Sequence, residues 1–491
     1  MTGVGYLLSA MIFAPLLGAL IIFCLPERRV TAIRVVAAVA AAISLALALR
    51  FTFAYDLVRG GIQFLTRATW IPAVGASYEI GADGMSLAMV LLNAFVLFAG
   101  VFASWRIETR VKEFFILLLV LATGVFGVFV SFDLLLFLTF YEVAVIPMFL
   151  LIGVWGSTRK EYAANKLTLY LLAGSILLIA GLILVYFETG MYTFDLLAIA
   201  GLHFDRVLQA RIFPFLFLGF AVLVPMWPFH TWSPVGHVAA PTAVSMLHAG
   251  VLMKLGAYGI IRVAVNLFPE GARMWAPAIA GLCTVNILYG AYVALAQHDL
   301  KYVIGYSSVS HMGYVLLGIA SFTTVGLSGA VFQMFSHGIM TGLFFSLIGV
   351  VYGETHTREI SELGGLARQM PAVATAFTIA ALTSLGLPGL SSFVAELLVF
   401  FGAFRRYPLL SVLGIAAIVV TASYILGVTG RVFFGAPREK WEHVHDTRPT
   451  DLVAAVLLIA VLLFFGLAPQ TFVSLVGSSV QPLMAKMGGL P

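Results

Sequence analysis

The chain has 491 residues, of which 61% are hydrophobic and 10% are charged, and its mean hydropathy is +1.05. A soluble domain carries roughly 25% charged residues, so this composition excludes a globular protein that folds in water. The net charge of +5 would also suit a nucleic-acid-binding protein, but the basic residues are scattered in short segments between apolar runs, which indicates membrane topology instead and no nucleic-acid partner.

Apolar runs bounded by charge, glycine and proline predict an all-α polytopic membrane protein of about 14 transmembrane helices, because a helix needs about 20 apolar residues to cross a bilayer. The first run ends at Pro26-Glu27-Arg28-Arg29 without a small-residue cleavage motif, so we expect a retained helix and not a signal peptide. In chain order the predicted helices cover residues 4–25, 31–52, 86–104, 113–130, 133–153, 165–186, 211–230, 241–264, 274–295, 302–320, 324–351, 371–404, 408–434 and 452–476.

The loops predict the orientation of the chain. An even number of crossings places both termini on one side, and roughly 16 basic residues fall on one set of loops against about 10 on the other. We therefore expect a protein of a bacterial cytoplasmic membrane with both termini on the outer side. The segment 53–85 has no spanning pattern and should lie over the outer face, whereas the polar segment 435–450 should be a solvated cytoplasmic loop.

The two cysteines, Cys24 and Cys283, each lie inside an apolar run and lack metal-ligand spacing. This pattern predicts neither a disulfide framework nor an iron–sulfur site. We expect no metal, no cofactor and no redox centre in this chain.

Three charged residues lie far from the ends of their predicted helices. Placing such a residue at mid-bilayer costs about 2.5–3.5 kcal/mol on insertion scales, so it usually faces a bundle interior or a hydrated cavity. Glu142 lies in the fifth predicted helix, just before Pro147, while Lys254 and Glu396 lie in the eighth and twelfth. These side chains indicate a proton or cation path.

Two predicted helices contain sequences that should interrupt them inside the membrane. Gly386-Leu387-Pro388-Gly389 precedes Glu396, and Pro225, Pro228 and Pro234 prevent one straight span in the first half of the chain. Discontinuous helices beside buried charges are typical of transporters built from inverted repeats. We expect two inverted five-helix repeats at 113–264 and 274–434, with N-terminal helices and an outer-face loop at 1–112 and a C-terminal helix and tail at 452–491.

His311 and His337 occupy apolar helices between Lys254 and Glu396 in the chain. Histidine can take and release protons near neutral pH. One buried histidine is more often a packed core residue, but two of them between a lysine and a carboxylate favour a proton relay. The alternatives are buried ion pairs that only fix helix register, or a carrier for a larger solute, for which the sequence offers few polar groups to line a cavity.

Several long motifs, spread over most of the chain, resemble the proton-conducting antiporter-like family of complex I, the NADH:quinone oxidoreductase. Glu396 stands where the subunit L and N branches carry lysine, and no long lateral helix of the subunit L kind follows, so the resemblance is to the subunit M branch. The motifs are Pro228 to Trp232, Ala240 to Ser245 continuing to Lys254 and Gly259, Ser308 to Gly313, Ser336 to Gly338, and Gly386 to Glu396.

The resemblance implies a proton-translocating subunit of the complex I membrane arm. Glu142 would begin the path, Lys254 would be the central carrier, His311 and His337 would bridge, and Glu396 would exchange protons towards the outer side. Electrons, NADH and quinone would be handled by other subunits, so the chain would be catalytic only within its complex. Its implied partners are other membrane-arm subunits, membrane lipid and protons.

The chain departs from the family pattern on the intake side. Leu223 stands where the family carries a lysine, the implied ion-pair partner of Glu142. The family's Trp-Leu-Pro-Asp-Ala-His is replaced by the segment from Trp232 to His237, which changes the chemistry of the entry side. His230 and His237 are further candidate site residues. His248, in the same predicted helix as Lys254, either replaces the missing base or packs in the core, and the sequence leaves both open.

Two other functions remain open on the sequence. A stand-alone cation/proton antiporter or a membrane-bound hydrogenase module would share the same motifs. A non-pumping scaffold of the membrane arm is suggested by the loss of the lysine at position 223.

Overall fold

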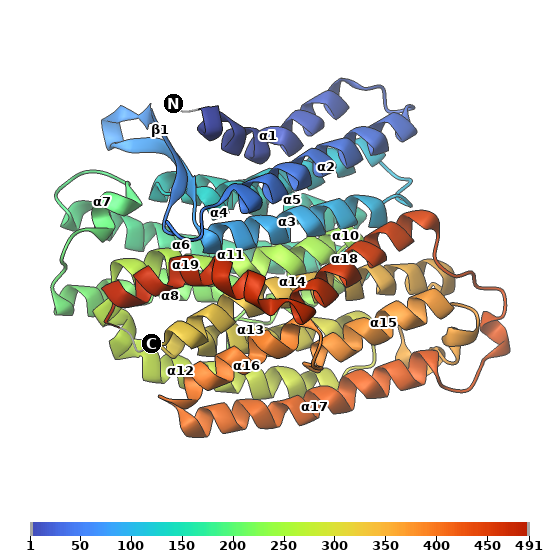
Figure 1. The fold of residues 1–491 in the computed structure, drawn as a ribbon. Helices are drawn as coiled ribbons and strands as arrows, with labels where there is room; N and C mark the ends of the chain where they lie inside the picture. Colours follow the sequence, from blue (N-terminus) through green and yellow to red (C-terminus); the bar gives the residue numbers. More distant parts are fainter. Residues whose placement is uncertain (1–2, 489–491) are drawn as a thin grey trace.

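The computed structural model describes residues 3–488 as a bundle of long helices with one β hairpin at its end (Figure 1). Within those residues, 13 helices are long and apolar enough to cross a membrane. The pair α15 (Pro371–Ser384) and α16 (Ser391–Phe404) adds one interrupted crossing. The predicted all-α fold with about 14 crossings is therefore confirmed.

The order of elements follows the apolar runs of the sequence. The remaining elements are α1 (Gly3–Cys24), α2 (Val30–Ala54), β1 (Gln63–Ile71), η1 (Pro72–Val74), β2 (Ala76–Ala82), α3 (Gly84–Ala103), α4 (Val111–Val130), α5 (Leu134–Trp155), α6 (Lys160–Glu188), α7 (Leu196–Ala200), α8 (Arg206–Leu223), α9 (Trp232–Ala239), α10 (Thr242–Leu247), η2 (His248–Leu252), α11 (Met253–Gly259), η3 (Ile260–Val265), α12 (Pro269–Leu295), α13 (Leu300–Ala320), α14 (Thr324–Thr355), η4 (Ile360–Glu362), η5 (Leu366–Arg368), α17 (Pro408–Phe433), η6 (Glu439–Trp441), α18 (Pro449–Leu467) and α19 (Pro469–Lys486).

Three predicted helices are divided in the structure. The range 211–230 was too long, because α8 ends at Leu223 and α9 begins only at Trp232, on either side of the proline-rich segment. The range 371–404 is split between α15 and α16, as the glycines and proline between them predict. The range 452–476 joins α18 to α19, which restarts at Pro469, since proline suits the first position of a helix.

Aspartates determine where several helices begin. In α3, α5, α7, α8 and α13 the residue before the helix is an aspartate whose carboxylate accepts backbone N–H groups of the first turn. Such a cap satisfies donors that have no partner inside the helix. The caps are Asp83, Asp133, Asp195, Asp205 and Asp299.

The segment predicted at 53–85 to lie over one face contains the hairpin. Strands β1 and β2 pair antiparallel, with Arg67 opposite Glu79. Phe132 donates a backbone hydrogen bond to Glu79, and Arg67 forms an ion pair with Asp195 at 2.8 Å. The hairpin therefore fastens the α4–α5 and α6–α7 connections at this end of the bundle, which we call the hairpin end.

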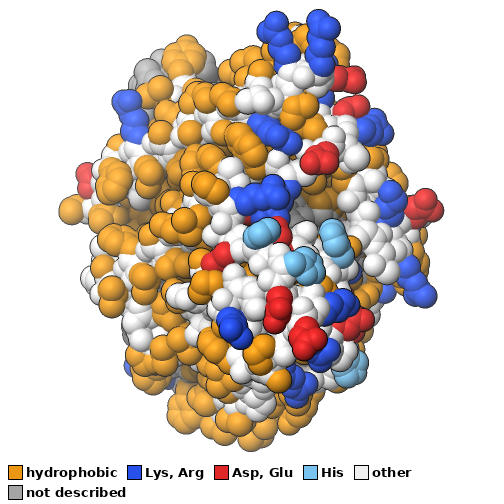
Figure 2. Space-filling view, turned by 90° about the vertical axis from the view of Figure 1, so that its right-hand side faces the viewer, with side chains coloured by type: hydrophobic (Ala, Val, Ile, Leu, Met, Phe, Trp, Pro, Cys, Tyr) orange, Lys and Arg blue, Asp and Glu red, His pale blue; other side chains and the backbone are white. Residues whose placement is uncertain are grey.

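The opposite end carries most of the basic loops and is called the basic end here. It comprises the α1–α2, α3–α4, α5–α6, α12–α13, α14–α15 and α17–α18 connections (Figure 1). Arg106 joins two of them through ion pairs with Glu354 at 3.1 Å and Asp451 at 2.7 Å. Charged and histidine side chains gather on this end, and hydrophobic side chains form its margin (Figure 2). Helix α1 begins and helix α19 ends toward the hairpin end (Figure 1).

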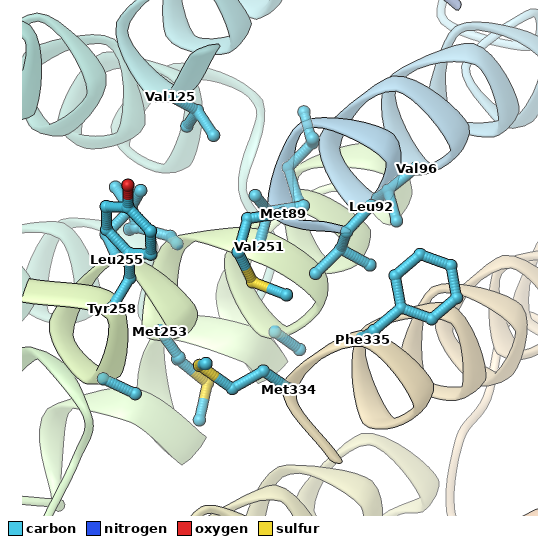
Figure 3. Packing of buried hydrophobic residues seen from close by; sticks show 14 of the residues in the cluster. Met89, Leu92, Val96, Val125, Val251, Met253, Leu255, Tyr258, Met334 and Phe335 are labelled. Atoms are coloured by element: carbon cyan, nitrogen blue, oxygen red, sulfur yellow. The ribbon is translucent and has the colours of Figure 1, made fainter. Parts of the chain in front are cut away.

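The centre of the bundle is formed by the crossing from α10 to η3, which is entirely buried. Apolar side chains of this crossing, such as Val251 and Leu255, pack among those of α3 and α14, including Leu92 and Phe335 (Figure 3). Burial of polar groups in such surroundings is unfavourable unless they are hydrogen bonded or needed for function. The polar side chains found there are therefore informative.

Candidate functional site

Lys254 lies at the middle of the buried crossing, in α11 between the two π-helical segments η2 and η3. Its side chain is fully buried, and its ammonium donates a hydrogen bond to the carbonyl of Ala249 in η2. A π-helical turn displaces backbone carbonyls from the regular α-helical pattern, and such turns are frequent at functional sites. The local backbone thus supplies an acceptor to a lysine that has no carboxylate partner among residues 3–488.

His337 on α14 is the next group in contact with Lys254. The Nζ of Lys254 lies 2.7 Å from the Nδ1 of His337, and both side chains are fully buried. The contact depends on a close crossing of the two helices at Gly250 and Gly338. A Cβ at Gly338 would come within 2.4 Å of the Gly250 carbonyl oxygen, so only glycine lets the backbones approach this far.

His311 on α13 follows His337, with ring centroids 5.2 Å apart. Its Nδ1 lies 3.2 Å from the amide Nε2 of Gln333 and 3.4 Å from Oε1 of Glu396. The same nitrogen therefore faces a donor and a carboxylate. It can accept from Gln333 when the imidazole is neutral and donate to Glu396 when the imidazole is protonated. Both protonation states are accommodated without moving a heavy atom.

Glu396 ends this series of side chains at the break between α15 and α16. Gln333 donates to its Oε1 at 3.3 Å. Gly386 has φ +67°, and a Cβ there would meet Oε2 of Glu396 at 2.8 Å, so the glycine both allows the turn and makes room for the carboxylate. Glu396 also lines a largely apolar cavity of about 490 Å³ with Phe393 and Phe400. Lys254, His337, His311 and Glu396 form what we call the central chain.

His237 and His248 form a separate pair on the basic-end side of Lys254. Their ring centroids lie 4.0 Å apart, and His248 also stacks on Trp232. The Nε2 of His237 is 3.1 Å from the hydroxyl of Ser233, while its Nδ1 and both nitrogens of His248 are buried with no hydrogen-bond partner among residues 3–488. Imidazoles left in this state are suited to water-mediated hydrogen bonding.

Glu142 stands apart from the central chain. Its Oε1 accepts a hydrogen bond from the hydroxyl of Ser175 on α6 at 2.7 Å. In the part of the chain that the structure describes, no ion pair or hydrogen bond joins Glu142 to a basic side chain, to Lys254 or to His248. Leu223 is fully buried. The predicted beginning of the path is thus not in contact with the rest of it.

His230 is also apart from the other predicted residues. It is 2% exposed and packs against the rings of Tyr289, at 4.9 Å between centroids, and Tyr306. No hydrogen bond or ring contact connects it to His237 or His248 within residues 3–488.

A fully paired buried charge lies one helical segment beyond Lys254. Arg262 in η3 forms an ion pair with Asp83 at 2.6 Å and a hydrogen bond to the Tyr258 hydroxyl at 3.1 Å. That arrangement satisfies both charges and fixes α3 against the central crossing. The contrast is informative, because Lys254 lacks such a carboxylate and contacts a titratable histidine instead.

Three polar residues of the site were missed by sequence reasoning. Ser175 holds Glu142, Gln333 links His311 to Glu396, and Ser384 contacts Nε2 of His311 at 3.2 Å. Gln333 precedes His337 by one helical turn in an apolar helix, so the sequence places both side chains on the same helix face and could have indicated this residue. The two serines gave no such indication, because serine is common in transmembrane helices.

Comparison with known proteins identifies the family to which the chain belongs. Residues 131–425 match the family model described as NADH:quinone oxidoreductase/Mrp antiporter, TM. The NADH-quinone oxidoreductase subunit M of Rhodobacter capsulatus is 38% identical over 463 residues, which cover 91% of this chain and 90% of that protein.

Two solved structures share the fold. A chain of respiratory complex I from Thermus thermophilus is 29% identical, with a TM-score of 0.91 over 98% of this chain and 100% of its own. A chain of the Mrp complex from Dietzia sp. DQ12-45-1b is 22% identical, with a TM-score of 0.86 over 99% of this chain and 98% of its own, and at this identity shows the fold alone. The chain belongs to the NADH:quinone oxidoreductase/Mrp antiporter family of membrane subunits.

Proposed function

We propose that the chain is a proton-translocating subunit of the membrane arm of a NADH:quinone oxidoreductase. The observation that carries the proposal is the central chain, in which a buried lysine without a carboxylate partner in residues 3–488, two histidines and a carboxylate from four helices follow one another in contact or near contact. Chains of this kind serve as proton relays in pumps, because each group binds a proton and passes it to its neighbour. The likeness to the subunit M of Rhodobacter capsulatus supports the complex.

Proton movement along the central chain follows from its contacts. Lys254 donates its proton to Nδ1 of His337, and His337 hands one to His311 through its ring or one intervening water. His311 then donates from Nδ1 to Glu396. Glu396 releases the proton towards the outer side. In this proposal NADH oxidation and quinone reduction take place in partner subunits, and this subunit carries protons only.

The orientation proposed for the bacterial inner membrane follows the charge bias. The basic end faces the cytoplasm, and the hairpin end, with both termini, faces outward. Other membrane-arm subunits and lipid cover the lateral surface, where large hydrophobic side chains such as Leu169 and Ile176 are about two-thirds exposed. Two inverted repeats at 113–264 and 274–434 fit the two interrupted helices, α8–α9 and α15–α16.

The test uses the whole complex reconstituted in liposomes with the Glu396→Gln variant. Glutamine keeps the shape and the hydrogen bond from Gln333 but cannot carry a proton at this position. We expect proton pumping to fall while the complex assembles normally. The control is Glu161→Gln, at an exposed position in the first turn of α6. Unchanged pumping by Glu396→Gln in a fully assembled complex would contradict the proposal.

A second function is favoured by the isolation of Glu142. A carboxylate held only by Ser175, with leucine at position 223, fits a scaffold that fills a place in the membrane arm without pumping. The Glu396→Gln experiment separates the two, because a scaffold pumps nothing that the variant can remove. A cation/proton antiporter would instead be purified without quinone-reducing partners and would exchange sodium for protons.

A further inference from the structure

A polar cavity of about 650 Å³ opens at the basic end, between the α5–α6, α12–α13 and α14–α15 connections. Its lining includes Arg159, His298, Asp299, Arg358 and Glu359. Val238 of α9 also lines it, so the cavity reaches the interrupted helix that carries His237. A charged cavity of this size is filled by solvent in a membrane protein. It is separate from the apolar cavity beside Glu396.

An ion pair lies at the inner side of this cavity. Nε of Arg358 is 3.1 Å from Oδ2 of Asp299, and Nη1 of Arg358 donates to the carbonyl of Val238 at 2.9 Å. Asp299 also caps α13, with its Oδ1 accepting from the backbone N–H of Lys301 at 2.7 Å. The guanidinium thus connects the end of α9 to the beginning of α13.

Lys301 lies directly behind this pair. It immediately precedes the predicted helix 302–320, but it is not a solvated loop residue. It is only 4% exposed, and its side chain points into the bundle. Its Nζ donates to the carbonyl of Ala240 at 2.7 Å and lies 3.4 Å from the hydroxyl of Ser245. It forms no ion pair with a carboxylate in residues 3–488. Lys301 is therefore a second buried lysine without a countercharge in contact.

The surroundings of Lys301 lead to the histidine pair. Ser245, which Lys301 approaches, donates to the backbone carbonyl of His237 at 2.9 Å. One turn further along α13, Gly305 lies against the ring of His237. A Cβ added at Gly305 would be 3.8 Å from Cδ2 of His237, which is ordinary van der Waals contact. The His237 ring thus lies one turn from Lys301 along α13, and it contacts His248, which is on the same crossing as Lys254.

We propose that the basic-end cavity is the intake for protons and that Lys301 passes them from its solvent to the His237–His248 pair and so to Lys254. In the step, one N–H bond of the Lys301 ammonium breaks and the proton passes through an intervening water, as an N–H bond forms on the imidazole of His237. Neutral Lys301 then takes a proton from a hydronium ion in the cavity, across the Arg358–Asp299 pair. The inference rests on the proposed function and deepens it by naming the intake and its carrier.

The first experiment compares Lys301→Met with Lys301→Arg in the reconstituted complex. Arginine keeps a positive charge and donors for the Ala240 carbonyl but does not release its proton. We expect both variants to lose as much pumping as Lys254→Met does. Wild-type pumping by Lys301→Arg would overturn the proposal, because it would reduce Lys301 to a cap for the end of α9. The matched control is Lys112→Met at the same end of the bundle.

The second experiment tests the cavity without changing a buried residue. Thr158, an exposed residue of its lining, is replaced by cysteine in a Cys24→Ser background, and a membrane-impermeant cationic thiol reagent is added from either side. We expect labelling from one side only and a loss of pumping on labelling. Thr109→Cys, exposed at the same end but outside the lining, should label without effect. Full labelling of Thr158→Cys with unchanged pumping would overturn the intake.

Failure of this inference is distinguishable from failure of the proposed function. If Lys254→Met abolishes pumping but Lys301→Met and the labelled Thr158→Cys do not, the central chain stands and the intake lies elsewhere. If Lys254→Met pumps normally, the proposed function itself is wrong.

Discussion

Replacement of His337 by leucine removes the group that joins Lys254 to the rest of the central chain. The lost contact is a 2.7 Å hydrogen bond between two fully buried side chains. A hydrogen bond to a charged group contributes about 1.5–3 kcal/mol, which corresponds to roughly 10- to 150-fold in an equilibrium constant. A positioned acid–base group contributes roughly 10²–10⁴-fold to the rate of proton transfer. The second effect is the larger, so transfer out of Lys254 should fall by about 100-fold or more.

The assay measures proton uptake or release and quinone reduction on the same liposomes. His337→Leu and His337→Gln should both lose the pumping due to this subunit, since glutamine restores hydrogen bonding but not proton exchange. Thr341→Val is the control. Thr341 lies one turn along α14 and its hydroxyl bonds only to backbone carbonyls of that helix, so pumping should persist. If His337→Leu pumps normally while Lys254→Met does not, protons leave Lys254 by another route and the reasoning is refuted.

Three further predictions concern groups outside the central chain. Leu223→Lys restores the basic residue of the family pattern at a fully buried position. If His248 has taken over the role of that base, Leu223→Lys should leave the proton-to-electron ratio unchanged and His248→Ala should abolish pumping. A changed ratio in Leu223→Lys together with normal pumping by His248→Ala would assign His248 to packing. Glu79→Gln should raise the thermal stability of the purified complex above about pH 7. Below pH 4.5, the ordinary pKa of a glutamate, it should not change the stability. Burial, with the negative charge of Asp195 adding to it, raises the pKa of Glu79 from 4.5 to about 7. The folded protein therefore binds this proton more tightly than the unfolded protein and gains stability as the pH falls through 7. An equal effect of the variant on stability at about pH 5 and pH 8 would contradict this reasoning.

The positions of the buried charges were predictable, because the insertion cost of a charge in hydrocarbon restricts where it can be tolerated. Lys254 and Glu396 stood out in their apolar runs, and the structure brings both together with His337 and His311. Their order of contact was not predictable from spacing alone. It depends on the crossing at Gly250 and Gly338, which is a tertiary arrangement.

Other features were hidden from the sequence for physical reasons. The π-helical turns beside Lys254 arise from packing and have no composition of their own. Strand β1 lies in a segment too polar to span a membrane and too irregular to show alternation, since its register is broken between Gln63 and Thr66. Lys301 immediately precedes the predicted helix 302–320, and a lysine at a helix end usually extends its side chain to solvent. The structure instead buries it against Ala240.

The resemblance to the antiporter-like family named four central residues that the structure brings together, while the role it implies for Glu142 stays a prediction. Glu142 accepts a hydrogen bond from Ser175, and within the described part of the chain no hydrogen bond or ion pair joins it to a basic side chain. A second buried lysine, Lys301, lies beside the His237–His248 pair on the basic-end side.

The most direct test of the account is the proton pumping of the assembled complex carrying Lys254→Met. Methionine fills a similar volume within the buried crossing but cannot hold a proton, so coupled turnover or the number of protons per electron should fall. Assembly is checked by the subunit content of the purified complex. Normal turnover and a normal proton-to-electron ratio in a complete complex would show that protons do not pass through this lysine, and the account would be wrong.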